Sequence, residues 1–434
     1  MLYATVTGYL ARLVMPVVLA LCLLAPAMVK AQQPYLVFFK DKAGSSFTTD
    51  RAEAFLSARA IARRQRQGIV VSARDLPVSP HYLEQIAATG ARVQYTTRWL
   101  NGALVYATPE QLPQLLALPF LRQANFPAGT LSPKAYYHKY MAPAFQPAGT
   151  ATDPGRAAGQ LSMLGITDMF EKGYRGQGII IAVFDSGFFR ADQLPGFDSL
   201  FSQNRVLATY DFVSNETAVF DNHRHGMQVL SVLAANQPGE LLGSAPGASY
   251  MLFRTEDVRN ESRLEEFYWL LAAEYADSAG VDIINSSLGY NLFDAPADDY
   301  RPEDLNGGTA LVTIAAELAA ATGMLVVNSA GNEGNGLWLG VVPPADGDSV
   351  LAVGAVDREG LLARFSSLGP TADGRIKPDL AAQGAGTVLL SPDGRITTSS
   401  GTSFSAPLVT GLAAGIWQAF PQLSAMQLLQ ILKE

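Results

Sequence analysis

Three residues stand at positions where, together, they could perform covalent catalysis. Asp185 follows the apolar run Ile179 to Phe184, His225 opens a helical stretch, and Ser403 precedes an apolar stretch that runs to Phe420. A serine hydroxyl is a weak nucleophile at neutral pH, so a neutral imidazole must take its proton during attack. A carboxylate orients that imidazole and stabilises its cation. This acid, base and nucleophile predict acyl transfer through a serine.

Each of these residues also has a simpler interpretation when taken alone. Asp185 could begin a turn, His225 could cap a helix or lie at the surface, and Ser403 could be a helix N-cap. The catalytic interpretation therefore depends on the three occurring together. Candidates for the base are few, since the chain has only four histidines, His81, His138, His223 and His225.

A further polar residue could stabilise the negative charge of a tetrahedral intermediate. Such an intermediate needs hydrogen-bond donors that are already in place. The amide of Asn332, after another apolar run, could supply one donor. The backbone N–H of Ser403, at a helix N-terminus, could supply a second.

Five continuous apolar runs after residue 176 alternate with helical stretches. Such runs are typical of parallel strands that are buried on both faces of a sheet. The expected strands are Ile179 to Phe184, Tyr250 to Phe253, Val281 to Ile284, Met324 to Val327 and Val350 to Val353. The expected helices are Gly226 to Ala235, Leu264 to Ala279 and Thr309 to Ala321. The alternation predicts an α/β fold with a doubly wound, mostly parallel sheet. Its active site should lie beyond the carboxyl ends of the strands.

The catalytic domain is expected over residues 161–434. The chain before it divides into three segments. Arg12 precedes an apolar run that ends in small residues, so residues 1–31 are expected to be a secretory signal peptide. A membrane anchor is the alternative, although spanning a bilayer takes about 20 apolar residues. Residues 32–130 predict a small α+β domain, with one helix over Arg51 to Arg66. Residues 131–160, rich in Pro and Gly, are expected to be a linker. The chain stops soon after the Ser403 helix, so its final helix could be incomplete.

Composition excludes several classes of function. The 31 Lys and Arg residues against 39 Asp and Glu give a net charge of −8, so no basic stripe indicates nucleic-acid binding. The single cysteine, Cys22, cannot form an internal disulfide, and no Cys/His cluster has metal-site spacing. No metal or cofactor is expected in catalysis. Structural calcium is left open, although residues 294–299 lack the spacing of an EF-hand loop.

From about residue 161 to its end, the chain resembles the subtilisin-like serine peptidases, the subtilase family. The motifs that carry the resemblance are Asp-Ser-Gly at Asp185, His-Gly at His225, Ser-Leu-Gly at Ser287, Gly-Asn-Glu-Gly at Gly331 and Gly-Thr-Ser-Phe-Ser-Ala-Pro at Gly401. Five motifs in this order make a specific signal.

The resemblance implies a role for each motif. Asp185, His225 and Ser403 would be the catalytic residues, and Asn332 would line the oxyanion hole. The segment Ser287, Leu288 and Gly289 would bind the substrate backbone, because an extended peptide can add to such an edge as a strand. The domain over residues 32–130 resembles the prosegments that cover the active-site cleft of these peptidases until they are removed.

The sequence departs from the family pattern beside two of these motifs. Met227 and Gln228 stand where the family usually has Thr, often followed by His, and Phe404 and Ser405 replace the common Met and Ala. None of these changes removes a reacting atom, but Met227 alters the packing behind the base. His223 is a second candidate base, although only His225 is followed by the glycine of the motif.

Together these features predict a secreted serine endopeptidase, extracellular or periplasmic, that works through an acyl-enzyme intermediate. Its expected partners are protein or peptide substrates and its own prosegment, and the mature form is expected to be a monomer with no membrane attachment. The alternative is a catalytically impaired protein of the same fold that binds peptides. An α/β-hydrolase would need Gly-x-Ser-x-Gly, which is absent. A nucleotide-binding protein would need a Gly-rich turn after its first strand, whereas Gly176-Gln177-Gly178 precedes it.

Overall fold

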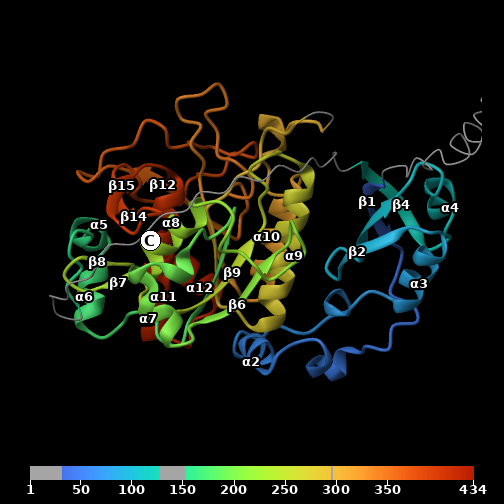
Figure 1. Ribbon diagram of the computed structural model, residues 1–434, viewed down its shortest axis with the longest axis horizontal. Coiled ribbons are helices and arrows are strands. Elements are labelled where there is room, and N and C mark those ends of the chain that lie inside the picture. Colours follow the sequence, from blue (N-terminus) through green and yellow to red (C-terminus); the bar gives the residue numbers. More distant parts are fainter. Residues whose placement is uncertain (1–31, 128–151, 295–296) are drawn as a thin grey trace, which may run out of the picture.

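The computed structural model describes residues 32–127, 152–294 and 297–434 (Figure 1). The expected signal peptide and most of the expected linker lie outside these residues. None of the helices in the described ranges is long and apolar enough to cross a membrane.

A four-stranded antiparallel sheet forms the core of the N-terminal domain, with strand order β2-β3-β1-β4. Side chains of a strand alternate between the two faces of a sheet. One face of this sheet therefore packs within its own domain, and the other packs against α9 (Arg263–Ala279) of the catalytic domain. Val37 and Phe39 pack with Ile86 and Leu115 under two helices of the domain. The strands are β1 (Gln33–Phe39), β2 (Arg92–Thr97), β3 (Gly102–Ala107) and β4 (Leu121–Pro127), and the helices are α2 (Ala58–Arg66), α3 (Pro80–Ala88), α4 (Leu112–Leu116) and the 3₁₀ turns η1 (Thr49–Ala54) and η2 (Ala73–Asp75).

The single helix expected over Arg51 to Arg66 is wrong. The segment contains the 3₁₀ turn η1 and then α2, separated by an extended residue at Ser57. The hydroxyl of Ser57 accepts a hydrogen bond from the backbone N–H of Ala60 at 3.2 Å. This side-chain cap satisfies a backbone donor that has no partner within the helix, so it fixes where α2 starts.

A seven-stranded sheet forms the core of the catalytic domain, in the order β13-β12-β11-β10-β5-β9-β6. All six neighbouring pairs are parallel, which confirms the doubly wound fold. The strands are β5 (Ile180–Asp185), β6 (Val206–Asp211), β9 (Ser249–Arg254), β10 (Ile283–Ser286), β11 (Leu325–Ser329), β12 (Val350–Val356) and β13 (Leu380–Gln383). Two short antiparallel pairs are β7 (Asn236–Gln237) with β8 (Leu241–Leu242) and β14 (Thr387–Leu390) with β15 (Ile396–Ser399).

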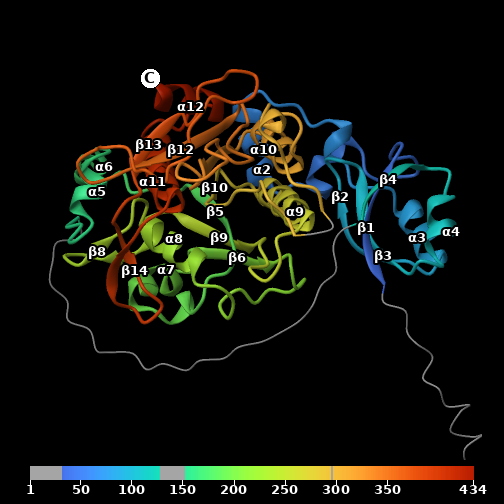
Figure 2. The same cartoon turned by 90° about the horizontal axis from the view of Figure 1, so that it is seen from above.

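Helices cover both faces of this sheet, as Figures 1 and 2 show. Ile181 and Val183 of β5 face a core that includes α8 and α11, whereas Ala182 and Phe184 face α9 and α10. The principal helices are α8 (His225–Ala234), α9 (Arg263–Ala279), α10 (Leu311–Ala321) and α11 (Thr402–Ala419). The others are α5 (Ala158–Ser162), α6 (Ile166–Glu171), α7 (Asp198–Ser202), α12 (Ala425–Lys433) and the 3₁₀ turns η3 (Ala191–Gln193), η4 (Pro195–Phe197) and η5 (Pro302–Asp304).

The five expected strands all form, with ends that differ by at most three residues. The sequence did not reveal β6 and β13, which are the two edge strands of the sheet. Strand β6 has one buried residue, Asp211, and β13 has four residues of which two are buried, so neither shows the continuous apolar run of a strand buried on both faces. Helix α5 begins at Ala158, three residues before the expected start of the catalytic domain.

Helix α11, which carries Ser403, packs closely against the turn at Ser244. A Cβ atom added at Gly411 would lie 2.1 Å from Ser244 Oγ. That hydroxyl donates to the carbonyl of Pro407 at 2.7 Å, so it cannot simply turn away. The glycine therefore sets the position of the helix.

Gly411→Ala should lower the free energy of unfolding by about 1–3 kcal/mol, because it overpacks this contact. The matched control is Gly159→Ala in α5, where an added Cβ meets nothing within 4 Å. The control should be neutral, or more stable by up to about 1 kcal/mol. Denaturant unfolding followed by circular dichroism measures both, and equal stability of the two variants would contradict the packing argument.

Candidate active site

The carboxylate of Asp185 lies fully buried at the carboxyl end of β5. Its Oδ1 accepts hydrogen bonds from Ser186 N at 2.7 Å and from His225 Nδ1 at 2.8 Å. A buried carboxylate in this position holds one tautomer and one orientation of the imidazole.

Gly226 allows the close approach of Asp185 and His225. A Cβ atom added at Gly226 would lie 2.7 Å from Asp185 Cβ and 2.5 Å from the carbonyl oxygen of Gly187. Met227 is fully buried beside it in the core under α8. The departure from the family at Met227 is therefore a matter of packing.

His225 is the first residue of α8, and its side chain is 27% exposed. Burial alone would lower the pKa of its imidazole. The charge of Asp185 and its hydrogen bond, with a smaller contribution from Glu256, outweigh burial and raise the pKa of His225 above its ordinary value. The ring of Phe404 packs at 5.7 Å between ring centres.

His223 lies close to His225 but in a different environment. Its Nδ1 is 2.9 Å from Ser186 Oγ and accepts the backbone N–H of His225 at 3.4 Å. Burial and the neighbouring His225 lower the pKa of His223. Asp185 bonds directly to the ring of His225, which favours His225 over His223 as the base.

Ser403 lies in the first turn of α11, where backbone N–H groups point outward. Its hydroxyl donates to the carbonyl oxygen of Ser287 at 3.2 Å, rather than to His225. Hydrogen bonds between catalytic groups are often loose without substrate and tighten in the reacting complex. Ser405, two residues on, is fully buried, and its hydroxyl has no hydrogen-bond partner among the described residues.

The side chain of Asn332 is oriented by the residue that precedes Ser403. Asn332 Oδ1 accepts from the backbone N–H of Thr402 at 2.9 Å and from its hydroxyl at 3.0 Å. With the oxygen engaged, the amide nitrogen of Asn332 remains as a donor beside Gly401, 3.8 Å from the position of an added Cβ. This role of Thr402 was not predicted from the sequence, where its place directly before Ser403 was the one signal.

The Ser-Leu-Gly segment leaves β10 and meets the first turn of α11. Ser287 Oγ donates to the carbonyl oxygen of Ser403 at 2.8 Å, so the two serines bond reciprocally. Asn328 Nδ2 holds the carbonyl oxygen of Leu288 at 3.0 Å. Gly289 is exposed, and a Cβ there would lie 2.1 Å from Val342 Cγ2. The segment is thus fixed from within while Gly289 faces outward.

A buried carboxylate that the sequence analysis missed lies near this site. Glu256 accepts a hydrogen bond from Thr255 Oγ1 at 3.1 Å and another from the hydroxyl of buried Tyr290. Burial raises the pKa of Glu256 to about 8, against the effect of the Tyr290 bond. Nothing in the spacing of Glu256 distinguished it from surface acids. Among the described residues, no group of three or more His, Cys, Asp or Glu could hold a metal ion.

Asp185→Asn should lower the pKa of His225, because it removes the charge that raises it. An NMR titration of the histidine ring nitrogens, in a Ser403→Ala background, measures this shift. The pKa of His223 should stay below its ordinary value of 6.5 in both proteins, because burial and His225 lower it and the opposing effect of Asp185 is smaller. An unchanged pKa of His225 would show that Asp185 is not its main partner.

Two family models match the chain. The subtilase family matches residues 176–434, and a propeptide domain of peptidase family S8 from Bacteroidota matches residues 34–140. A crystal structure of a cold-adapted subtilisin-like serine proteinase aligns with a TM-score of 0.46 and 23% identity, over 59% of this chain and 81% of that one.

Curated relatives agree with the family models. Subtilisin DY of Bacillus licheniformis is 33% identical over 260 residues, which cover 59% of this chain and 82% of the relative. Subtilisin NAT of Bacillus subtilis subsp. natto is 32% identical over 265 residues, which cover 60% of this chain but only 61% of the relative. The chain therefore belongs to the subtilase family as a serine-type endopeptidase with an N-terminal prosegment.

Proposed function

We propose that this chain hydrolyses peptide bonds in protein substrates, with Asp185, His225 and Ser403 as its catalytic triad. The observation that carries the proposal is the 2.8 Å hydrogen bond from His225 Nδ1 to buried Asp185. It leaves Nε2 of the same ring as the acceptor for a proton, beside the helix turn that bears Ser403. Aligned acid, base and hydroxyl are what serine acyl transfer requires.

The proposed reaction has two halves. His225 Nε2 takes the proton of Ser403 Oγ as that oxygen bonds to the substrate carbonyl carbon, and the C–N bond then breaks as His225 returns the proton to the leaving amine. Water, deprotonated by the same nitrogen, then attacks the carbonyl carbon of the acyl-enzyme ester, and the bond to Ser403 Oγ breaks as His225 returns the proton to that oxygen. In both halves, the amide of Asn332 and the backbone N–H of Ser403 would stabilise the oxyanion.

The first step requires the hydroxyl of Ser403 to leave its present acceptor. It now donates to the Ser287 carbonyl at 3.2 Å, which is a long bond for a hydroxyl donor. Rotation about the Cα–Cβ bond redirects the hydroxyl without moving the helix. Bound substrate would favour that rotation, because its carbonyl carbon must lie against Ser403 Oγ.

Substrate recognition would use main-chain groups. Gly289 is exposed at the end of a segment that is fixed from within, so it can pair with an extended peptide as an added strand. Main-chain pairing tolerates many side chains, which suits an endopeptidase of broad substrate range.

The flanking segments would control where and when the enzyme works. We propose that residues 1–31 direct export, so that the enzyme acts outside the cytoplasm. Residues 34–140, which match a propeptide domain, would hold the peptidase inactive until they are removed. The structural support is that Trp99 and Leu104 of this domain share a buried core with Tyr268 of α9.

Ser403→Ala should abolish both casein hydrolysis and labelling by a serine-directed phosphonylating reagent in the mature enzyme. Ser405→Ala, on the same helix, should keep both, because its buried hydroxyl makes no bond among the described residues. Peptide mapping by mass spectrometry locates the label. Label at Ser405, or casein left intact by the parent enzyme, would reject the assignment and favour a peptide-binding protein.

Asn332→Ala should lower kcat about 10²–10³-fold with little change in KM, a magnitude already known from loss of this kind of donor in subtilisin. Asn335→Ala, exposed in the same loop, is the matched control and should behave as the parent. Steady-state kinetics on a peptide anilide separates kcat from KM. A loss confined to KM would assign Asn332 to substrate binding instead.

A further inference from the structure

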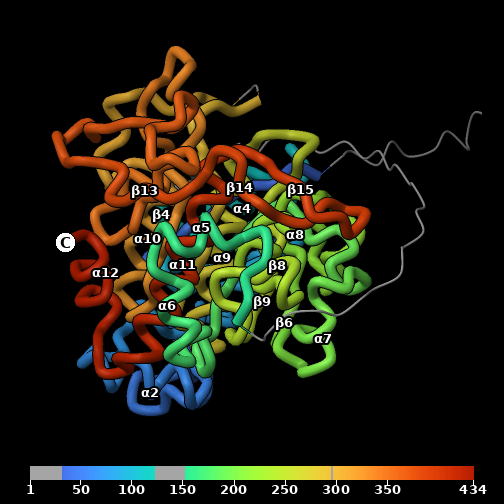
Figure 3. The backbone as a smooth tube through the Cα atoms, turned by 90° about the vertical axis from the view of Figure 1, so that its left-hand side faces the viewer, coloured from blue at the N-terminus to red at the C-terminus, as the bar shows by residue number. Residues whose placement is uncertain are grey.

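Helix α2 of the prosegment contacts the catalytic domain at the end of the large sheet opposite to the candidate active site. Its contact surface is the amino-end rim, defined as residues 277–282 together with Thr322 and Gly323, which precede β10 and β11. Ser57 N donates to the carbonyl of Ser278 at 2.9 Å, and Gln67 Nε2 donates to that of Gly323 at 2.8 Å. Figures 1 and 3 show α2 at the lower edge of the molecule, and Figure 1 shows it apart from the small sheet.

The two surfaces meet backbone to backbone at one glycine. Gly280 ends α9 in the left-handed conformation, with φ of 88°. A Cβ added there would lie 2.8 Å from the backbone nitrogen of Ala60 in α2. The glycine therefore serves both the end of α9 and the fit of α2.

Arg63 is the central side chain of this contact and is only 1% exposed. Its guanidinium bonds Asp277 Oδ1 at 2.5 Å, Thr322 O at 3.3 Å and the carbonyl of Val281. All three acceptors belong to the amino-end rim. Among the described residues, the hydrogen bonds of the Arg63 guanidinium therefore all cross between the two domains.

Charge reinforces the same contact. Asp277 is fully buried, and it also bonds Arg64 at 2.8 Å and Arg98 at 2.6 Å. Arg59 pairs with Asp282 at the edge of the rim. Guanidinium groups bind carboxylates with fixed geometry, so the rim accepts a basic helix in one orientation.

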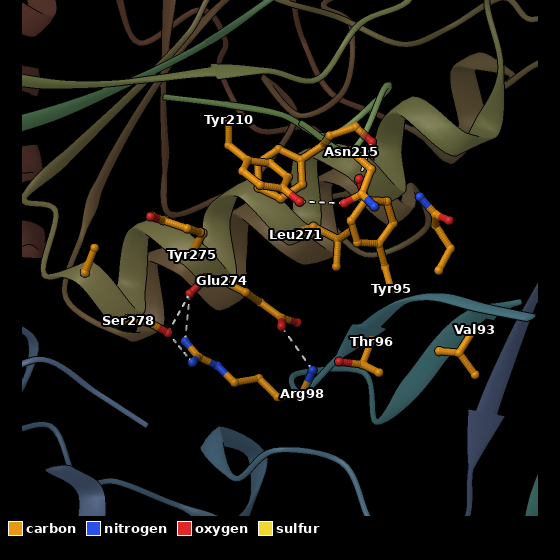
Figure 4. Close-up of a pocket in the computed structure, with 13 residues that line it drawn as sticks. Val93, Tyr95, Thr96, Arg98, Tyr210, Asn215, Leu271, Glu274, Tyr275 and Ser278 are labelled. Atoms are coloured by element: carbon orange, nitrogen blue, oxygen red, sulfur yellow. Dashed lines mark hydrogen bonds between the residues drawn. The ribbon is translucent and has the colours of Figure 1, made fainter. Parts of the chain in front are cut away.

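The sheet side of the interface is less complete. A cavity of about 740 Å³ lies between β2 and α9, with Tyr95 on one side and Tyr210 and Tyr275 on the other (Figure 4). Glu274 closes one part of the boundary by accepting the backbone N–H groups of Arg98 and Trp99, both at 3.0 Å. The sheet contact thus combines the buried side chains of Trp99 and Leu104 with this open space, whereas the helix contact is made by buried ion pairs.

We propose that α2 is a separate anchor that keeps the prosegment bound to the catalytic domain after the connecting chain has been cut. The proposal rests on the proposed inhibitory role of residues 34–140. The rim lies at the amino ends of β10 and β11, which are four and five residues long, so it is about 13–17 Å from their carboxyl ends. The anchor can therefore stay in place whether or not the rest of the prosegment covers the candidate active site. Release of the prosegment would require α2 to leave the rim.

The test uses the full chain with Ser403→Ala, so that its outcome does not depend on catalysis. A recognition sequence for a site-specific protease, inserted between residues 140 and 152, allows the connection to be cut. Arg63→Ala is compared with Arg66→Ala, whose side chain is exposed on the same helix. Size-exclusion chromatography follows the two fragments, and hydrogen exchange with mass spectrometry follows α2, β1 and β3.

The cut parent and Arg66→Ala should elute as intact complexes. Arg63→Ala should exchange the amides of α2 at least tenfold faster, keep β1 and β3 protected, and release the prosegment after the cut. Arg59→Ala, which removes the α2 contacts with Asp282 and with the carbonyl of Gly280, should cause the same release and decides the matter if Arg63→Ala misfolds. Fragments of the parent that separate, or Arg63→Ala behaving as Arg66→Ala does, would overturn the proposal. A failure of the triad assignment would instead appear only in the phosphonylation experiment.

Discussion

In a sheet whose seven strands all run parallel, the strands end at the same edge, and the residues of the candidate active site collect there. Asp185 ends β5, Ser287 follows β10 and Asn332 follows β11 within three residues. Two helices then begin at that edge, and each brings one more group, His225 on α8 and Ser403 on α11. Helix N-termini add outward N–H groups and a favourable dipole for negative charge, which is the charge that an acyl-transfer intermediate develops.

Two buried aspartates show how the protein uses charge at opposite ends of the sheet. Asp185 keeps one main partner, so its charge acts on His225 and raises the pKa of that imidazole. Asp277 has three guanidinium partners, and its charge is fully engaged in joining domains. Removing one partner of a buried ion pair leaves an unpaired buried charge, which is strongly destabilising. Such a contact is therefore specific even where the intact pair adds little net stability. One carboxylate thus acts on the candidate base His225, and the other joins the two domains.

The sequence predicted the parallel sheet and the residues of the candidate site because those features are local. Continuous apolar runs mark buried strands, and Asp185, His225 and Ser403 each stand within a short, specific motif. The edge strands β6 and β13 were not predicted, because neither has a continuous run of buried apolar residues. There is another reason why the sequence did not predict the roles of Thr402, Glu256 and Arg63. Their roles come from contacts between residues far apart in the chain, such as Arg63 with Thr322, 259 positions away, and no periodicity encodes such pairs.

A crystal structure of the mature enzyme phosphonylated by a serine-directed reagent tests the proposed triad and oxyanion hole in one experiment. The phosphorus should be bonded to Ser403 Oγ, with one phosphonyl oxygen about 2.7–3.1 Å from both Asn332 Nδ2 and Ser403 N. His225 should keep its Nδ1 bond to Asp185 while Nε2 turns toward Ser403 Oγ. An adduct on another residue, or a phosphonyl oxygen that Asn332 does not contact, would contradict the account.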